Sequence, residues 1–351
     1  MLGSIWIYRL YDVAEEIDLV KAEEILSQRK KVSRLRLLKV RPKSISFKDP
    51  PISMNLESDQ LMVGPYLFDT KVTARIYDLG VITVTLRLIL PQEMTYEELI
   101  KLAVDLSSPT VLQEVFEGYL QTVRNELSPA LIKGAYQGFV EDFLVYYFKE
   151  WDPNWDPVPL LLAEEEQVSE EVRQETLQHT YKYTKDWTTI TWDTAIVCDP
   201  TESSDIPDLL EFANAQLLEL RYYDNVLEKE IEGMYDAIEE ADQGNNYRRL
   251  SKYRHITKQL LELVADITAI KGRIENSLRV TQDVFYARIY AAALKVLRVK
   301  EWAESIDQKV SIIERTYSML SEEVESRRLF WLEAAIVILI AFEIIIWLFT
   351  L

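Results

Sequence analysis

Apolar residues in the C-terminal part of the chain recur at spacings of three and four positions, the period of a helix that buries one face. Such series cover residues 206–241, 256–274 and 289–324, and no proline follows Pro207. Because proline costs about 3 kcal/mol inside a helix, its absence permits very long helices. The pattern predicts a helical coiled-coil stalk over 206–328. Its first two helices should be antiparallel, because only residues 244–246 separate them.

The end of the sequence is one continuous apolar segment. Residues 329–351 read LFWLEAAIVILIAFEIIIWLFTL, with two acids and no base. A hydrocarbon core about 30 Å thick needs about 20 helical residues at 1.5 Å each, so this segment predicts a transmembrane helix. Trp331 and Trp347 lie near its two ends, and Arg327 and Arg328 precede it directly. We therefore expect a tail-anchored, single-pass protein of the cytoplasmic (inner) membrane, with the bulk of the chain on the cytoplasmic side.

The N-terminal part contains shorter apolar runs that are typical of strands. A strand–helix–strand order followed by further strands predicts a small α+β domain over 1–150, for which a ferredoxin-like fold is one option. The expected strands, rich in β-branched and aromatic residues, are 5–11, 33–40, 71–78, 81–90 and 139–148. The expected helices are 17–28 and a segment over 96–127 that Pro109 interrupts.

An acidic connector with short strands is expected over 151–205, between the α+β domain and the stalk. It begins with the sequence WDPNWDPVP, whose Trp151 and Trp155 suggest either a docking point for a partner or a packed turn, and we favour the turn. Residues 164–178 are acidic and predicted to be helical. Alternation over 188–198 predicts a strand or a hairpin.

Charge limits the partners of the chain. A formal net charge of −19 argues against general nucleic-acid binding, which needs positive potential over the protein body. Residues 208–242 carry 11 acids and 2 bases, whereas 247–279 carry 8 bases and 3 acids, so these two helices should form complementary pairs. Each exposed pair contributes only about 0.2–1 kcal/mol, which favours the correct helix partner more than it adds stability. The single cysteine, Cys198, fits a reducing compartment and is expected to be a small core residue.

Glu343 is the most unusual residue of the predicted transmembrane helix. It follows Glu333 by ten residues, so it lies about 15 Å further along the helix, near the middle of the membrane. An acid at that depth costs about 2.5–3.5 kcal/mol on insertion scales. Our hypothesis is that Glu343 hydrogen-bonds between the helices of a homo-oligomer. A tolerated acid without a role and an ion pathway are the alternatives.

A basic run, QRKKVSRLRLLKVRPKS, covers residues 28–44 and contains eight bases and no acid. Such a run suggests contact with anionic lipid head groups or with ribosomal RNA. Because its apolar residues alternate with the bases, a solvated strand edge is the favoured alternative. The candidate contact residues are Arg29, Lys30, Lys31, Arg34, Arg36, Lys39, Arg41 and Lys43.

Residues for enzymatic or metal chemistry are sparse in the sequence. His179 and His255 are the only histidines, and neither has the HxxxH or CxxC spacing of a metal site. The sequence contains no glycine-rich phosphate loop and no GxSxG turn. We therefore expect no catalytic residue, no metal and no cofactor, and a protein that is not an enzyme.

Three segments resemble those of a known membrane-anchored family. The sequence YRLYDVAEEIDLVKAEEIL at 8–26 is similar to its first strand and helix, and IYDLGVITVTLRL at 76–88 to its strand pair around an Asp-x-Gly-Val turn. The sequence RRLFWLEAAIVILIAFEIII at 327–346 is similar to its C-terminal helix. The family is typified by the mitochondrial protein required for meiotic nuclear division. Because no mitochondrial presequence is evident, a prokaryotic member is expected, although residues 150–180 have no counterpart in the family.

This resemblance implies a non-enzymatic, membrane-bound, oligomeric protein. The mitochondrial relatives support organellar translation by helping to anchor ribosomes near the inner membrane. We therefore expect a membrane scaffold or assembly protein that tethers a large protein partner, with the translation machinery as the partner that the resemblance names. The alternative is an oligomeric cation channel or transporter of CorA-like architecture, against which the single span and the missing Gly-Met-Asn loop argue. A membrane-tethered enzyme is a further rival.

Overall fold

The computed structural model of the chain contains two compact units. Unit 1 comprises Met1–Tyr222 and Gly272–Trp302, and unit 2 comprises Tyr223–Lys271 and Ala303–Leu351. The residues that the structure describes are 3–28, 31–35, 37, 45–58, 60–108, 110–134, 138–242, 246–276, 278–280 and 284–350.

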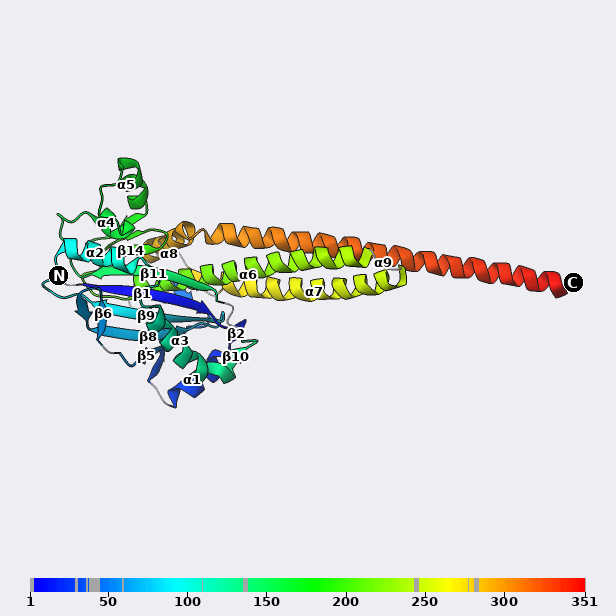
Figure 1. The fold of residues 1–351 in the computed structure, drawn as a ribbon, viewed down its shortest axis with the longest axis horizontal. Helices are drawn as coiled ribbons and strands as arrows, with labels where there is room; N and C mark the ends of the chain where they lie inside the picture. Colours follow the sequence, from blue (N-terminus) through cyan, green and yellow to red (C-terminus); the bar gives the residue numbers. More distant parts are fainter. Residues whose placement is uncertain are drawn as a thin grey trace. The chain divides into compact units, whose positions relative to one another are not determined.

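A nine-stranded mixed sheet forms the centre of unit 1 (Figure 1). In spatial order its strands are β12 (Thr180–Lys182), β13 (Trp187–Ile190), β14 (Thr194–Cys198), β11 (Val140–Phe148), β1 (Gly3–Asp12), β9 (Val81–Ile89), β8 (Thr70–Ile76), β5 (Ile52–Leu56) and β3 (Val32–Arg34). Neighbouring strands are antiparallel, except that β11 and β14 are parallel. The N-terminal strand β1 therefore lies in the middle of the sheet, paired with β9 and β11.

The position of β1 explains its nearly continuous apolar sequence, because both faces of a central strand are covered. In its register, Ile7 lies opposite Leu86 of β9 on one side and Leu144 of β11 on the other. One sheet face carries the main apolar core, to which alternate residues of β1, β8 and β9 contribute. The opposite face carries polar as well as apolar side chains, including Tyr8 and Thr83.

Helices α1 (Leu19–Ser27), α2 (Tyr96–Leu106), α3 (Gln113–Leu127) and α4 (Pro157–Leu162) contribute to the main core. Their starts are fixed by local capping: the Asp18 carboxylate accepts from two backbone N–H groups of α1, and Thr95 and Glu98 form a capping box on α2. The buried face of α2 includes Leu99 and Leu102, and that of α3 includes Phe116. These side chains exclude water from the sheet face on which the core lies.

The opposite sheet face is covered by the first part of α6 (Asp205–Asp242), with α8 (Val284–Val296) packed against that helix. Phe212 of α6 lies 5.9 Å from Tyr77, between ring centroids, and 6.3 Å from Tyr290 of α8. The Tyr147 hydroxyl of β11 donates to the carbonyl oxygen of Ser203, over 3.0 Å, just before α6 begins. Unit 1 is therefore layered, with the sheet between two sets of helices.

The turn between β8 and β9 requires glycine at position 80. Gly80 has φ +96°, and a Cβ atom there would lie 1.8 Å from the Ala14 carbonyl oxygen. The Gly80 carbonyl accepts from the backbone N–H of Val13 over 3.1 Å, so the turn is fastened to the chain that follows β1. Only a residue without a side chain permits both this conformation and this close approach.

Most predicted elements of the N-terminal part are confirmed, but the predicted boundaries differ from the structure. Strands 5–11, 71–78, 81–90 and 139–148 correspond to β1, β8, β9 and β11, helix 17–28 to α1, segment 96–127 to α2 and α3, and 188–198 to the β13–β14 hairpin. Residues 151–205 are not a separate connector, because β12, β13 and β14 belong to the same sheet as β1. The ferredoxin-like option is not confirmed, since the sheet has nine strands.

The remaining elements of unit 1 are short. They are β2 (Glu16–Ile17) paired with β10 (Leu131–Ile132), β4 (Ile45–Phe47) with β15 (Leu278–Val280), β6 (Leu61–Val63) with β7 (Tyr66–Phe68), the 3-10 helix Ser128–Ala130 and helix α5 (Glu170–Leu177).

Unit 2 consists of the second part of α6, most of α7 (Asn246–Asn276) and most of α9 (Val299–Thr350), which run side by side (Figure 1). Ion pairs join these helices: Lys252 of α7 with Glu240 of α6, Lys271 of α7 with Asp307 of α9, and Lys309 of α9 with Asp224 of α6. The order of these contacts makes α6 and α7 antiparallel neighbours. The coiled-coil packing predicted for 206–328 remains a prediction. The range itself differs from the structure, because α6 up to Tyr222 and all of α8 belong to unit 1.

Candidate functional site

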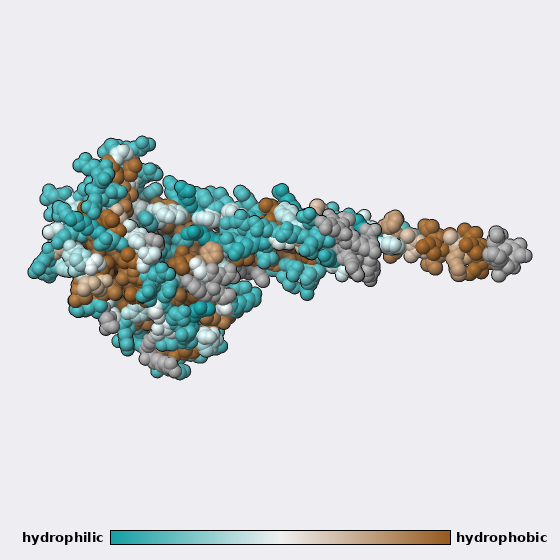
Figure 2. Space-filling model, in the orientation of Figure 1, coloured by the Kyte–Doolittle hydropathy of each residue, from teal (hydrophilic) through white to brown (hydrophobic). Residues whose placement is uncertain are grey.

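The C-terminal part of α9 has an apolar surface on a helix of membrane-spanning length. It is the one described helix that is long and apolar enough to cross a membrane, and none of its most apolar window is buried. Figure 2 shows apolar residues gathered along this end of the helix. Leu329, Val337 and Leu339 have exposed fractions of 57%, 64% and 67%. The other helices of unit 2 do not bury this apolar surface.

The predicted membrane residues lie on this part of α9. Trp331, Glu333 and Glu343 are exposed, as is Arg328 at its start. Arg327 is engaged within the helix, because its guanidinium donates to the Glu323 carboxylate over 2.6 Å. The side chain of Trp347 lies outside the described residues.

The predicted basic contact run is described only in part, and one of its members has a structural role. Arg34 of β3 pairs with Glu23 of α1 over 2.7 Å, and it donates to the carbonyl oxygens of Pro50 and Leu19 over 2.9 and 3.1 Å. Arg34 therefore ties three segments of unit 1 together and is not free for lipid or RNA. Lys31 is exposed. Arg29, Lys30, Arg36, Lys39, Arg41 and Lys43 lie outside the described residues.

A buried charge cluster lies between the sheet and α6. The Arg75 guanidinium donates to the carboxylates of Asp208 and Glu211, and the Tyr77 hydroxyl donates to Glu211 over 2.9 Å. The two carboxylates have no exposed surface, and the Arg75 side chain is 10% exposed. Alternation along β8 places Arg75 on the face opposite the main core, where α6 lies.

The electrostatics of this cluster are dominated by burial. Desolvation raises the pKa of both Asp208 and Glu211, while the Arg75 guanidinium opposes the rise. The two acids share one cation. Burial also raises the pKa of Tyr8, whose hydroxyl has no hydrogen-bond partner within the described part of the chain. Because the cluster is closed to solvent, its role is to hold α6 on the sheet.

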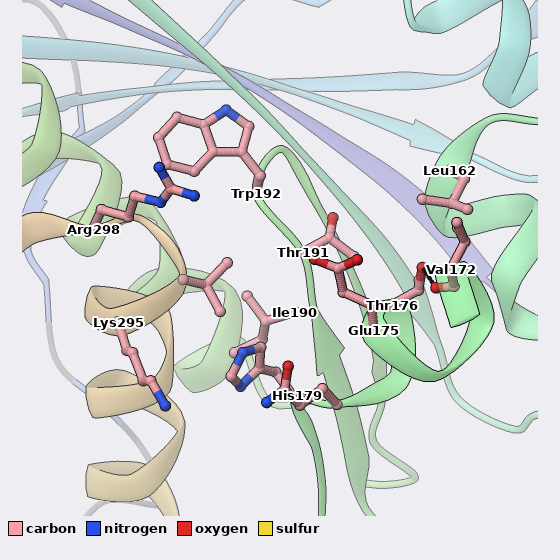
Figure 3. Close-up of a pocket in the computed structure, with 12 residues that line it drawn as sticks. Leu162, Val172, Glu175, Thr176, His179, Ile190, Thr191, Trp192, Lys295 and Arg298 are labelled. Carbon is pink, nitrogen blue, oxygen red and sulfur yellow. Dashed lines mark hydrogen bonds between the residues drawn. The ribbon is translucent and has the colours of Figure 1, made fainter. Parts of the chain in front are cut away.

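An open cleft of about 600 Å³ lies between α5, the β13–β14 hairpin and the end of α8, all in unit 1 (Figure 3). Lys295 and Arg298 lie on one side, Leu162 and Val172 on the opposite side, and His179 between them. Trp192 lies in the turn between β13 and β14 and also lines the cleft. The other lining residues are Glu175, Thr176, Gln178, Ile190, Thr191 and Val296.

The cleft combines positive charge with a neutral imidazole. Burial lowers the pKa of His179, and the nearby Lys295 ammonium lowers it further, so the ring is neutral at pH 7. A neutral imidazole donates one hydrogen bond and accepts another. Sequence reasoning missed this site because His179 and Lys295 are distant in the chain, and no spacing rule connects them.

The remaining residues singled out in the sequence belong to the core or to open surface. Cys198 is buried in β14, which confirms the expected core role, and burial raises the pKa of its thiol to about 11. Trp155 stacks on Tyr96 with ring centroids 5.1 Å apart, and Trp151 meets Trp155 edge-on at 5.3 Å, so the packed turn is confirmed. His255 is exposed on α7. Within the described ranges, no three acidic, histidine or cysteine side chains converge as a metal site.

Comparisons with known proteins concern mainly the N-terminal part of the chain. The family described as "Uncharacterized protein MJ0711, N-terminal domain" matches residues 2–205, which is more than half of the sequence. The uncharacterized protein MJ0711 of Methanocaldococcus jannaschii is 30% identical over 222 residues, which cover 59% of this chain and 66% of that protein. No solved structure matches the chain. Neither match is to the family typified by the mitochondrial protein required for meiotic nuclear division, so the resemblance to that family remains a prediction.

Proposed function

The chain belongs to the family described as uncharacterized protein MJ0711, N-terminal domain, and within that family we propose that it is a non-enzymatic scaffold held at a membrane by α9. In this proposal the protein is tail-anchored in the cytoplasmic membrane, with unit 1 in the cytoplasm. One observation carries it: the described side chains from 329 to 346 are apolar with two exceptions, and all but one are exposed.

The length of this segment supports the membrane role. From residue 329 to Thr350 the helix is continuous, which corresponds to about 33 Å at 1.5 Å per residue. That length matches a hydrocarbon core of about 30 Å. Exposed apolar patches of this extent are rare on soluble monomers, because each buried CH₂ group contributes about 0.8 kcal/mol.

We further propose that the protein is a homo-oligomer in which Glu343 hydrogen-bonds across helices within the membrane. The support is the position of Glu343 on the exposed apolar surface, about 15 Å from Glu333 along the helix. Crosslinking in native membranes compares the wild type with Glu343→Leu and, as a matched control, Glu333→Leu. We expect the control to keep the wild-type oligomer and Glu343→Leu to lose it. An unchanged oligomer in both variants would remove Glu343 from the interface.

The tethering role is tested by identifying what unit 1 contacts. Crosslinking with mass spectrometry in native membranes should recover the same large protein partner reproducibly, and by the family resemblance this partner is the translation machinery. A truncated chain that ends at Arg328 should no longer associate with the membrane and should no longer crosslink to this partner. Cation flux into liposomes that depends on Glu343 would instead favour the channel alternative.

A further inference from the structure

The cleft between α5, the β13–β14 hairpin and α8 has the dimensions of a small-molecule site, and the membrane proposal makes no use of it. Its volume of about 600 Å³ lies within the range of about 300–1,000 Å³ that is usual for ligand pockets. Apolar side chains such as Ile190 and Val296 line it together with hydroxyl, amide and charged groups. This mixture suits a ligand with one charged end and one apolar or planar end.

Positive charge is concentrated on one side of this cleft. Lys295 and Arg298 both line it, and within the described part of the chain neither forms an ion pair. Glu175 is the one acid among the lining residues, although the chain as a whole carries a net charge of −19. The cleft is therefore locally positive on an acidic protein, which favours an anion.

A ring-binding surface lies beside this charge. Trp192, at the tip of the β13–β14 hairpin, is 47% exposed and lines the cleft together with Arg298. An aromatic ring and a guanidinium plane both stack on planar ring compounds, and such stacking contributes without selecting one particular ring.

The neutral ring of His179 adds a hydrogen-bonding group close enough to Lys295 to feel its charge. A phosphate or phosphate ester offers acceptor oxygens to an ammonium group and to an imidazole N–H together. Lys295 also lies in the last turn of α8, where a cation interacts favourably with the helix dipole. The experiment below separates these two roles of Lys295.

We propose that this cleft binds a phosphate ester of a planar ring compound, of the size of a nucleoside monophosphate. The phosphate binds near Lys295 and His179, and the ring binds against Trp192 beside Arg298. This inference is independent of the membrane anchor and of the oligomer, because all four residues belong to unit 1.

Isothermal titration calorimetry of the full chain in detergent tests the proposal with three probes: adenosine monophosphate, adenosine and inorganic phosphate. We expect adenosine monophosphate to bind, and each of the other two to bind at least tenfold more weakly. Lys295→Ala should lower the affinity of the protein for adenosine monophosphate about fivefold to tenfold. Trp192→Ala should lower the affinity for adenosine monophosphate by a similar factor and leave the affinity for inorganic phosphate unchanged.

Lys185→Ala is the matched control, since Lys185 is exposed in the turn between β12 and β13 and does not line the cleft. Thermal unfolding checks that each variant folds, and Arg298→Gln provides a second charge change at the site. Absence of adenosine monophosphate binding would overturn the proposal, as would equal affinity for inorganic phosphate or for adenosine. A Lys295→Ala variant that unfolds at lower temperature but binds as the parent does would restrict Lys295 to the helix dipole and also overturn it.

Discussion

Arg75 of β8 and Asp208 of α6 are 133 residues apart in the sequence and form a buried ion pair on the second face of the sheet. We predict that Arg75→Met lowers the free energy of unfolding by about 3–5 kcal/mol, because it leaves Asp208 and Glu211 buried without their cation. Urea denaturation monitored by circular dichroism measures the change. Lys133→Met is the control: Lys133 is 63% exposed in its pair with Glu15, so its loss should change stability by less than about 1 kcal/mol.

Asp12 should make the protein less stable as pH rises from about 4 to about 7. Burial raises the pKa of Asp12 to about 7, and its Oδ2 atom has no partner within the described residues. The folded state therefore keeps a proton that the unfolded chain releases near pH 4, and stability is lost as pH rises through this window, by at most about 4 kcal/mol.

Asp12→Asn isolates this effect, because the amide stays neutral at every pH. Urea denaturation at pH 5 and pH 8 should show a smaller loss of stability for the variant than for the wild type. Asp208 and Glu211 also have a raised pKa, but they titrate in both proteins and cancel in the comparison. Equal pH dependence in the two proteins would show that Asp12 is ionised in the folded state.

Two glycines should respond to alanine in opposite directions. Gly80→Ala should destabilise unit 1 by more than about 2 kcal/mol, because φ is +96° and the added Cβ atom would lie 1.8 Å from the Ala14 carbonyl oxygen. Gly118→Ala should stabilise the protein by about 0.5–1 kcal/mol, since Gly118 lies within α3 and an added Cβ meets no atom within 4 Å. Thermal unfolding of both variants checks this pair, and a stable Gly80→Ala protein would contradict the turn geometry.

Arg34 and Lys31 belong to one basic run but should differ in their effects. Arg34→Ala removes two hydrogen bonds to backbone carbonyls and a half-exposed pair with Glu23, so a loss of about 1–2 kcal/mol of stability is expected. Lys31→Ala should leave stability unchanged within about 0.5 kcal/mol. Liposome or RNA binding by this run is therefore better tested at Lys31. Equal stability of the two variants would show that the Arg34 contacts contribute nothing.

The sequence predicted those elements whose own periodicity is strong. The apolar runs of β1, β8 and β9 and the long helices α6, α7 and α9 were visible because their spacing repeats over many residues. The pairing of β14 with β11 was not visible, since the pattern of a strand does not identify its neighbour. For that reason the segment 151–205 was predicted to be a connector.

The start of α6 shows a second limit of sequence reasoning. Residues 205–220 are buried on all sides, although they include Asp208, Glu211, Asn214 and Glu219. Polar residues on a heptad-patterned helix normally indicate a solvent-facing surface. Here part of that polar surface faces Arg75 and Tyr77 from a distant strand pair, so only tertiary contacts reveal its burial. The cleft was missed for the same reason, because its cations and its tryptophan come from separate segments.

The central position of β1 has a consequence for synthesis of the protein. Strand β1 needs β9 on one edge and β11 on the other, and β11 begins only at Val140. At about 5–20 residues per second, roughly 6 to 26 s pass between the end of β1 and the start of β11. During that time β1 has an unpaired edge, so a nascent chain of this protein should depend on chaperone binding until the sheet closes.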